Sequence, residues 1–266
     1  MTGATGVVAS IDWLAEHTDD SDVVVVDVRD GWEFEAIGHV PGAVSIPFDT
    51  FREAGGDVGM LPGAERFGSL LSSAGVEPSD TLVAYDDEHG VFAARFLVTA
   101  IMYDHDDVRL LDGDVTAWSR AEPTTTDAPD VTPTDYDASI PTDRPLIDAD
   151  GVLAAIEGST DVVLVDTRTP EEFAEGHIEG AVNVDWRDLV DPDTRGLKPR
   201  EELAAILDSY GVMPGKHVIL YCNTARRISH TYLVLRHLGY GDVSFFEGSL
   251  TEWRDRDLPL VSGGGE

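Results

Sequence analysis

The chain has 266 residues, which suits two domains of roughly 130 residues each better than one minimal module. Acidic residues number 51 and basic residues only 18, giving a formal net charge of −33. This charge repels nucleic-acid phosphates and anionic membranes, so we expect neither as a partner. Hydrophobic residues make up 42% of the chain, which is enough for a core in each half and excludes a disordered acidic protein.

The acidic residues are spread along the whole chain, and lysine occurs only at Lys198 and Lys216. We expect such a surface in a protein of a salt-loving organism, where a Debye length of ~3 Å in molar salt screens the self-repulsion. An ordinary acidic cytosolic protein is the alternative. The first residues lack the basic start and apolar core of a secretory signal, and no apolar run approaches the ~18 residues of a membrane span. We therefore expect a cytoplasmic protein.

Short apolar runs alternate with amphipathic stretches along the chain. Runs of β-branched residues with few polar neighbours are typical of buried parallel strands. Apolar residues at helical spacing, closed by a glycine, predict helices. Strands that alternate with helices indicate an α/β fold with a parallel sheet. In chain order, the expected elements include a helix over Phe92–Tyr103, a strand over Val162–Val165, a helix over Arg200–Tyr210, a strand over Val218–Tyr221 and a helix over Ile228–Leu238.

The second half of the chain repeats the first. The offset between matching segments drifts only from 139 to 135 residues, far above the usual ~20–50 residues of a solenoid repeat, so two homologous domains are predicted. The matches are Val23–Arg29 with Val162–Arg168, Glu33 and Phe34 with Glu172 and Phe173, Gly38–Val44 with Gly176–Val182, Gly75–Pro78 with Gly211–Pro214, Thr81–Asp86 with His217–Cys222, and Asp112, Gly113 and Trp118 with Glu247, Gly248 and Trp253.

A segment rich in proline, threonine and aspartate separates the two halves. It runs over residues 124–144, and its low apolar content predicts an extended linker. The first domain then covers residues 1–123 and the second covers residues 145–266. A long surface loop within one domain is the alternative interpretation.

Cys222 is the only cysteine, which excludes an intramolecular disulfide and a cysteine-rich metal site. It lies at the carboxyl end of a predicted buried strand and just before a helix, where open parallel sheets bind ligands. The helix N-terminus and the adjacent Arg226 and Arg227 favour a thiolate, the nucleophilic form of the side chain. The alternative is an inert buried thiol.

The motifs together resemble those of the tandem-domain rhodaneses, which are thiosulfate sulfurtransferases, over nearly the whole chain. They are Asp27-x-Arg29 with Gly38-His39-x-Pro-Gly-Ala, Asp166-x-Arg168 with Gly176-His177-x-x-Gly-Ala, the loop Cys222–Arg227, Ser229-His230-Thr231, and the Glu-Gly-x-x-x-x-Trp253 tail.

The resemblance implies two homologous rhodanese-like domains, each a small parallel sheet flanked by helices. The second domain is then catalytic, with Cys222 as the nucleophile that forms a persulfide. The first is inactive, because Asp86 stands at the cysteine position and would repel an anionic donor. The substrates would be a small anionic sulfur donor and a cyanide or thiol acceptor. Neither a cofactor nor a metal is implied, and a tandem chain is expected to work as a monomer.

The resemblance also implies which residues bind the donor. These are Asn223, Thr224, Ala225, Arg226 and Arg227 of the loop, with Arg168 as a further candidate. The family's loop usually reads Cys-Arg-x-Gly-x-Arg or Cys-Arg-x-Gly-x-Thr, so Asn223 and Ala225 depart from the pattern, and Arg226 could replace the missing charge. Ala resists backbone conformations that Gly allows.

Two arginines outside the loop could line the anion site. Arg168 follows a strand-end aspartate, and Arg187 lies in the next loop. The Asp166-x-Arg168 pair is more often a structural link than a substrate contact.

Three other functions remain open. Sulfurtransferases for 3-mercaptopyruvate usually carry small and hydroxyl residues in the loop, whereas Arg227 favours thiosulfate. A persulfide carrier would load sulfur without efficient turnover on small acceptors. A cysteine-dependent phosphatase or arsenate reductase would need an arginine after five intervening residues, where this chain has Ile228.

Overall fold

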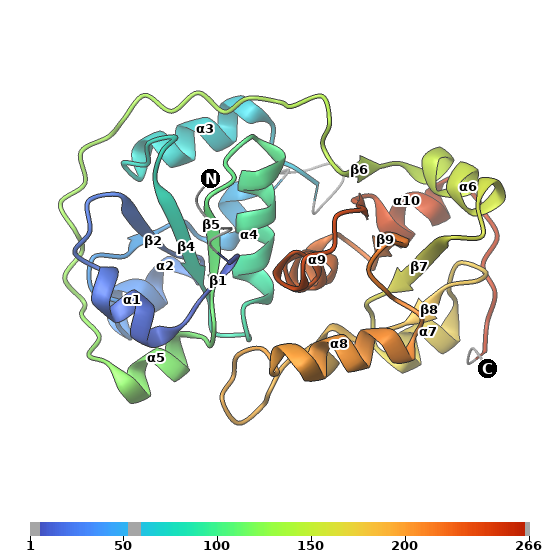
Figure 1. Cartoon of the computed structure of the whole chain (residues 1–266). Coiled ribbons are helices and arrows are strands. Elements are labelled where there is room, and N and C mark those ends of the chain that lie inside the picture. Colours follow the sequence, from blue (N-terminus) through green and yellow to red (C-terminus); the bar gives the residue numbers. More distant parts are fainter. Residues whose placement is uncertain (1–5, 53–59, 264–266) are drawn as a thin grey trace. The chain divides into compact units, whose positions relative to one another are not determined.

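The computed structural model describes residues 6–52 and 60–263 of the chain. Two compact units result. Unit 1 comprises residues 1–144 and 192–197, and unit 2 comprises residues 145–191 and 198–266. Each unit is an α/β domain with its own parallel five-stranded sheet (Figure 1). The first five and last three residues, which the sequence assigns to the ends of the two domains, lie outside the described residues.

The sheet of unit 1 has the strand order β1-β5-β4-β2-β3, and all its pairs are parallel. Every residue of β4 is buried, as the apolar run predicts for a central parallel strand. The strands are β1 (Val8–Ala9), β2 (Val23–Asp27), β3 (Val44–Ser45), β4 (Thr81–Tyr85) and β5 (Val108–Leu111).

Helices cover both faces of this sheet. Leu14, Phe34 and Trp118, from α1, α2 and α5, share one core cluster with Val83 of β4. On the other side, α4 packs against β4 and β5, and its Phe96 contacts aromatic rings of η1 and α3. The helices are α1 (Ile11–His17), α2 (Gly31–Ala36), η1 (Phe48–Phe51), α3 (Ala64–Ser73), α4 (Val91–Met102) and α5 (Val115–Ala121).

The sheet of unit 2 repeats this topology in the order β6-β10-β9-β7-β8. All its pairs are parallel, and β9 lies in the middle. The strands are β6 (Leu146–Ile147), β7 (Val162–Asp166), β8 (Val182–Asn183), β9 (His217–Tyr221) and β10 (Val243–Phe246).

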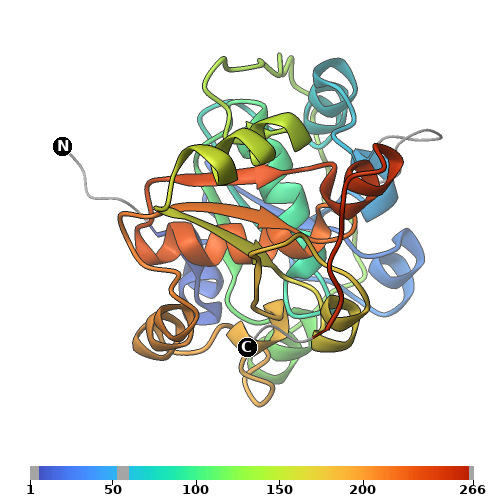
Figure 2. The same cartoon turned by 90° about the vertical axis from the view of Figure 1, so that its right-hand side faces the viewer.

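The helices of unit 2 also lie on both faces of their sheet, with α6 and α9 on opposite sides (Figure 2). Residues of α6 and α10 share a core cluster with Ile219 of β9. The helices are α6 (Ala149–Gly158), α7 (Pro170–Glu175), η2 (Trp186–Leu189), α8 (Arg200–Ser209), α9 (Arg226–Leu238) and α10 (Ser249–Asp255). The predicted α/β fold with two homologous parallel-sheet domains is therefore confirmed.

The segment 124–144 has neither a helix nor a regular strand, yet it packs along unit 1. The backbone N–H of Thr134 donates to Ser72 O at 3.0 Å. The side chain of Tyr136 is buried, and its hydroxyl lies 2.9 Å from Nδ1 of His105. The segment expected as a linker is thus an extended strap anchored by one buried aromatic ring.

A short segment within the second half of the chain also belongs to unit 1. It consists of residues 192–197, which lie between η2 and α8 in the sequence. Arg195 Nε donates to Asp114 Oδ2 at 2.6 Å, and Leu197 N donates to Asp112 Oδ1 at 2.8 Å. The second unit is therefore discontinuous, which differs from the single boundary that the composition predicts.

Candidate active site

Cys222 directly follows the central strand β9 at its carboxyl end. The backbone N–H of Cys222 donates to Ser249 Oγ at 3.1 Å, and Leu250 N donates to Cys222 O at 3.0 Å. The cysteine is only 2% exposed. The turn that opens α10 therefore fixes the backbone from which the thiol projects.

The loop from Cys222 to Arg227, called here the Cys222 loop, turns sharply into α9. Ala225 adopts a left-handed conformation with φ of 64° and is completely buried. Its carbonyl accepts a hydrogen bond from Ser229 Oγ at 2.8 Å. The helix begins at Arg226, so the positive end of its dipole lies at the loop. Ala225 thus takes the backbone geometry for which glycine is the usual residue.

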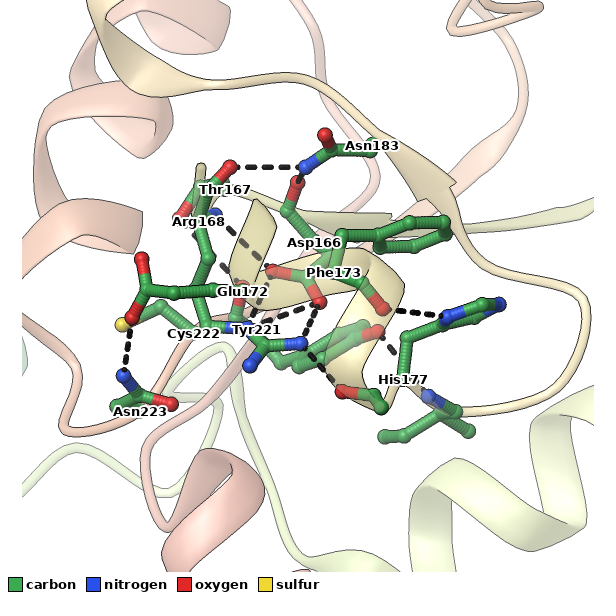
Figure 3. Close-up of polar contacts among 12 residues, drawn as sticks. Asp166, Thr167, Arg168, Glu172, Phe173, His177, Asn183, Tyr221, Cys222 and Asn223 are labelled. Atoms are coloured by element: carbon green, nitrogen blue, oxygen red, sulfur yellow. Dashed lines mark hydrogen bonds and ion pairs between the residues drawn. The ribbon is translucent and has the colours of Figure 1, made fainter. Parts of the chain in front are cut away.

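Glu172 of α7 joins two side chains of this loop. Asn223 Nδ2 donates to Glu172 Oε1 at 2.9 Å (Figure 3). Arg227 Nη1 forms an ion pair with the other carboxylate oxygen of Glu172. The same oxygen accepts a bond from the Thr169 backbone N–H at 3.2 Å, within the capping box of α7. Burial alone would raise the pKa of Glu172, but the bonds from Arg227, Thr169 and Asn223 lower it overall.

Arg168 lies at the end of the neighbouring strand, but its side chain bonds to residues outside the Cys222 loop. It is 2% exposed, and its Nη2 donates to Asp166 Oδ2 at 2.6 Å and to Gly176 O at 2.7 Å (Figure 3). Asp166 pairs in register with Tyr221, the residue before Cys222. This geometry favours the structural link over a donor contact for Arg168.

The other candidate residues lie nearer the surface. Thr224 is exposed, and Arg226 is partly exposed in the first turn of α9. Arg187 is exposed on η2, where its guanidinium lies 5.8 Å from the ring centre of Trp186. Burial raises the pKa of the adjacent Asp185, although its hydrogen bond from the Arg187 N–H and the charges of Arg187 and Arg227 oppose this shift. The structure thus pairs Arg227 with the carboxylate of Glu172.

Unit 1 holds a carboxylate at the position of the thiol. Asp86 follows β4 as Cys222 follows β9, and its carbonyl likewise accepts a bond from the N–H of Val115. Its Oδ1 accepts from the N–H groups of Glu88 and Gly90, both at 2.8 Å. Its Oδ2 accepts from the N–H groups of Phe92 at 2.7 Å and Ala93 at 3.0 Å. A loop at this place in the fold can therefore surround an anionic group with backbone donors.

Two site residues were not predicted as such. The sequence does draw attention to Glu172, because a glutamate, Glu33, stands at the matching position of the first half. That recurrence alone does not indicate a contact with the loop. The sequence gives no such indication for Ser249, because a different residue, Asp114, stands at the matching position of the first half. Both contacts join segments far apart in the sequence, which motif spacing does not reveal.

Among residues 6–52 and 60–263, no group of three or more histidine, cysteine or carboxylate side chains could hold a metal ion. Within the same residues, no helix combines the length and apolar character needed to cross a bilayer.

Comparison with known proteins identifies the class. A family model for the rhodanese-like domain matches twice, over residues 10–121 and 148–256. Because the two matches together cover most of the chain, it belongs to the rhodanese family as a tandem-domain member.

The relatives define the chemistry more closely. A putative thiosulfate sulfurtransferase of Mycobacterium bovis, SseA, is 32% identical over 95% of this chain and 89% of its own length. A sulfur carrier protein of Thermus thermophilus, TtuD, is 33% identical over 97% of both chains. The crystal structure of SseA from Escherichia coli, described as a 3-mercaptopyruvate sulfotransferase, superimposes with a TM-score of 0.82 at 26% identity over 92% of this chain and 99% of that one. The chain is thus a sulfurtransferase of the rhodanese family.

Proposed function

We propose that this protein is a thiosulfate sulfurtransferase that carries sulfur as a persulfide on Cys222. The Cys222 thiolate attacks the outer sulfur of thiosulfate, a cysteine–sulfur bond forms, and the sulfur–sulfur bond of the donor breaks to release sulfite. The persulfide then gives its outer sulfur to cyanide or a thiol, and the Cys222 thiolate returns. A small substrate is more compatible with a chain of net charge −33 than a nucleic acid is.

The observation that carries this proposal is the matching position of Cys222 and Asp86. In unit 1, four backbone N–H groups hold the anionic side chain at the end of the central strand. A persulfide extends Cys222 by one sulfur atom and is anionic, so it is the kind of group such a loop stabilises. Arg226 and the N–H groups of Asn223, Thr224 and Ala225 would add to that stabilisation. Unit 1 would not transfer sulfur, because a carboxylate cannot form a persulfide.

A second candidate function is that of a sulfur carrier protein. It is favoured by the 33% identity to TtuD over nearly the full length of both chains. A carrier would form the same Cys222 persulfide but pass it efficiently only to a partner protein. A third candidate, a 3-mercaptopyruvate sulfurtransferase, differs only in the donor, and the ratio of kcat/KM for the two donors distinguishes it.

The test is thiocyanate formation from thiosulfate and cyanide, measured in molar KCl. We expect turnover by the native protein and none above the uncatalysed rate for Cys222→Ser. Asp86→Asn is the matched control in unit 1 and should retain turnover. Activity that survives in Cys222→Ser would overturn the proposal, and Cys222-dependent hydrolysis of an aryl phosphate would move the protein to the phosphatase class.

A further inference from the structure

We propose that Glu172 positions the Cys222 loop and that its charge weakens the binding of dianionic sulfur donors, thiosulfate included, more than the binding of donors of lower negative charge. The proposal rests on the proposed function, because the group it acts on is the Cys222 sulfur. Glu172 is a positioning residue and need not touch the donor.

The contacts of Glu172 span the loop from end to end. One carboxylate oxygen accepts from Asn223, the residue after Cys222, and the other pairs with Arg227, its last residue. The Asn223 Oδ1 atom is buried and accepts no hydrogen bond from any residue that the structure describes, so the bond to Glu172 is what orients the amide. Because both ends of the loop are tied to one carboxylate on α7, their separation depends on Glu172.

The same contacts reduce the positive charge that the loop offers to a donor. Arg226 and Arg227 are the cationic side chains of the loop. Glu172 forms an ion pair with Arg227. Arg226, Arg227 and Glu172 together carry one positive charge when all three are ionised, whereas the two arginines alone would carry two. A dianion would gain less here than beside two uncompensated arginines, whereas a monoanion or a neutral donor would lose little.

Unit 1 shows that this arrangement is specific to the Cys222 loop. Glu33 stands at the matching place, and its Oε2 accepts from the Asp30 N–H in the same kind of capping box. However, Asp87 occupies the position of Asn223, and Phe92, the second residue of α4, occupies the position of Arg227, the second residue of α9. Burial, and then the charge of Asp87, raises the pKa of Glu33. A carboxylate at this position therefore caps its helix in both units but meets an arginine only in unit 2.

The decisive experiment compares two alkylating reagents on the single cysteine. Iodoacetate is an anion and iodoacetamide is neutral, and both alkylate the same Cys222 sulfur. Both reagents need the same thiolate and the same opening of the loop, so these two factors cancel in the ratio of the alkylation rates. The ratio therefore reports how the charge of the site affects the anionic reagent relative to the neutral one. We expect Glu172→Gln to raise the iodoacetate-to-iodoacetamide ratio about 3–10-fold at low salt, with the effect shrinking in molar KCl. Glu33→Gln removes the matching charge in unit 1, while the glutamine oxygen can still accept the capping bond, and this variant should leave the ratio unchanged.

Further variants distinguish the effect of the charge of Glu172 from the effect of the length of its side chain. Glu172→Asp keeps the charge on a shorter side chain, so the ratio should stay near that of the native protein while kcat falls. Arg227→Gln leaves the carboxylate uncompensated and should lower the ratio. If Glu172→Gln changed both alkylation rates by the same factor, the proposal would be wrong and Glu172 would have only a structural role.

Steady-state kinetics with two sulfur donors test the effect of Glu172 on donor binding. In Glu172→Gln, the KM for thiosulfate, a dianion, should fall more than the KM for 3-mercaptopyruvate, a monoanion. An equal change in the two values contradicts the proposal. If the native protein itself showed no turnover, the proposed function would fail, but the alkylation ratios would still decide the role of Glu172.

Discussion

Ala225 adopts a backbone conformation that disfavours its side chain. Its φ of 64° lies in the left-handed region, which costs an L-residue other than glycine about 1–2 kcal/mol. The residue is fully buried and directly precedes α9. The Cys222 loop therefore keeps the geometry of a glycine-containing loop at some cost in stability.

Replacing Ala225 by glycine should remove this strain. We expect Ala225→Gly to raise the free energy of unfolding by up to about 1 kcal/mol, because the strain relieved exceeds the added flexibility of the unfolded chain. Urea denaturation measures the change. The matched control is Ala205→Gly, an exposed position within α8, which should lower stability by about 0.5–1 kcal/mol. A loss of stability in Ala225→Gly as large as in the control would contradict the strain argument.

Asp86 predicts a pH effect in unit 1. Burial raises the pKa of Asp86 to about 6, although four backbone N–H bonds oppose the shift. An aspartate in the unfolded chain titrates near pH ~4, so between these values the folded protein binds more protons than the unfolded one. The contribution of Asp86 to stability is then largest below pH ~4 and declines as pH rises to about 6, by about 3 kcal/mol in total.

The comparison of native protein with Asp86→Asn isolates this titration from the other carboxylates. Urea unfolding at several pH values in molar KCl should show the stability of the native protein declining relative to the variant across that window. Parallel curves for the two proteins would mean that Asp86 has an ordinary pKa.

At the scale of elements, both units tie the end of a strand to the turn after the next helix. In unit 1, Arg29 Nη2 lies 2.5 Å from Asp27 Oδ2 and 2.8 Å from Gly38 O. Arg168 makes the same pair of contacts in unit 2, with Asp166 and Gly176. Because the link recurs in the unit without a cysteine, we interpret it as structural.

Removing either arginine should therefore destabilise the protein. Arg29→Ala and Arg168→Ala each leave a buried carboxylate without its partner, which costs about 3–5 kcal/mol. Thermal unfolding should show comparable losses for both variants. An Arg168→Ala protein of native stability but weakened thiosulfate binding would instead make Arg168 a donor-binding residue.

The elements themselves could be predicted from the sequence because they depend on local patterns. The apolar run before Cys222 is strand β9, and the helical spacing that ends at Gly239 is α9. The position of Cys222 at the end of a central strand follows from parallel topology. The contacts of Glu172 could not be predicted, since they join residues 51 and 55 positions apart. The packing of residues 124–144 combines hydrogen bonds to unit 1, such as that from Thr134 to Ser72, with the buried ring of Tyr136, and composition reveals neither.

At the scale of the whole molecule, the net charge of −33 opposes a compact state. The Debye length is ~10 Å in 0.1 M salt and ~3 Å in 1 M salt, so molar salt screens most of this repulsion. We expect the Tm to rise by roughly 5 °C between about 0.1 and about 2 M KCl, which corresponds to about 2 kcal/mol. Thermal unfolding over a KCl series measures this rise, and an unchanged Tm would contradict a salt-adapted surface.

The central claim is that Cys222 carries the transferred sulfur, and the intact mass of the protein after incubation with thiosulfate tests it most directly. The native protein should gain the mass of one sulfur atom, located on the peptide that contains Cys222, and lose it when cyanide is added. Cys222→Ser should gain nothing. A sulfur adduct that persists in Cys222→Ser, or thiosulfate turnover by a native protein that never acquires the adduct, would contradict the account.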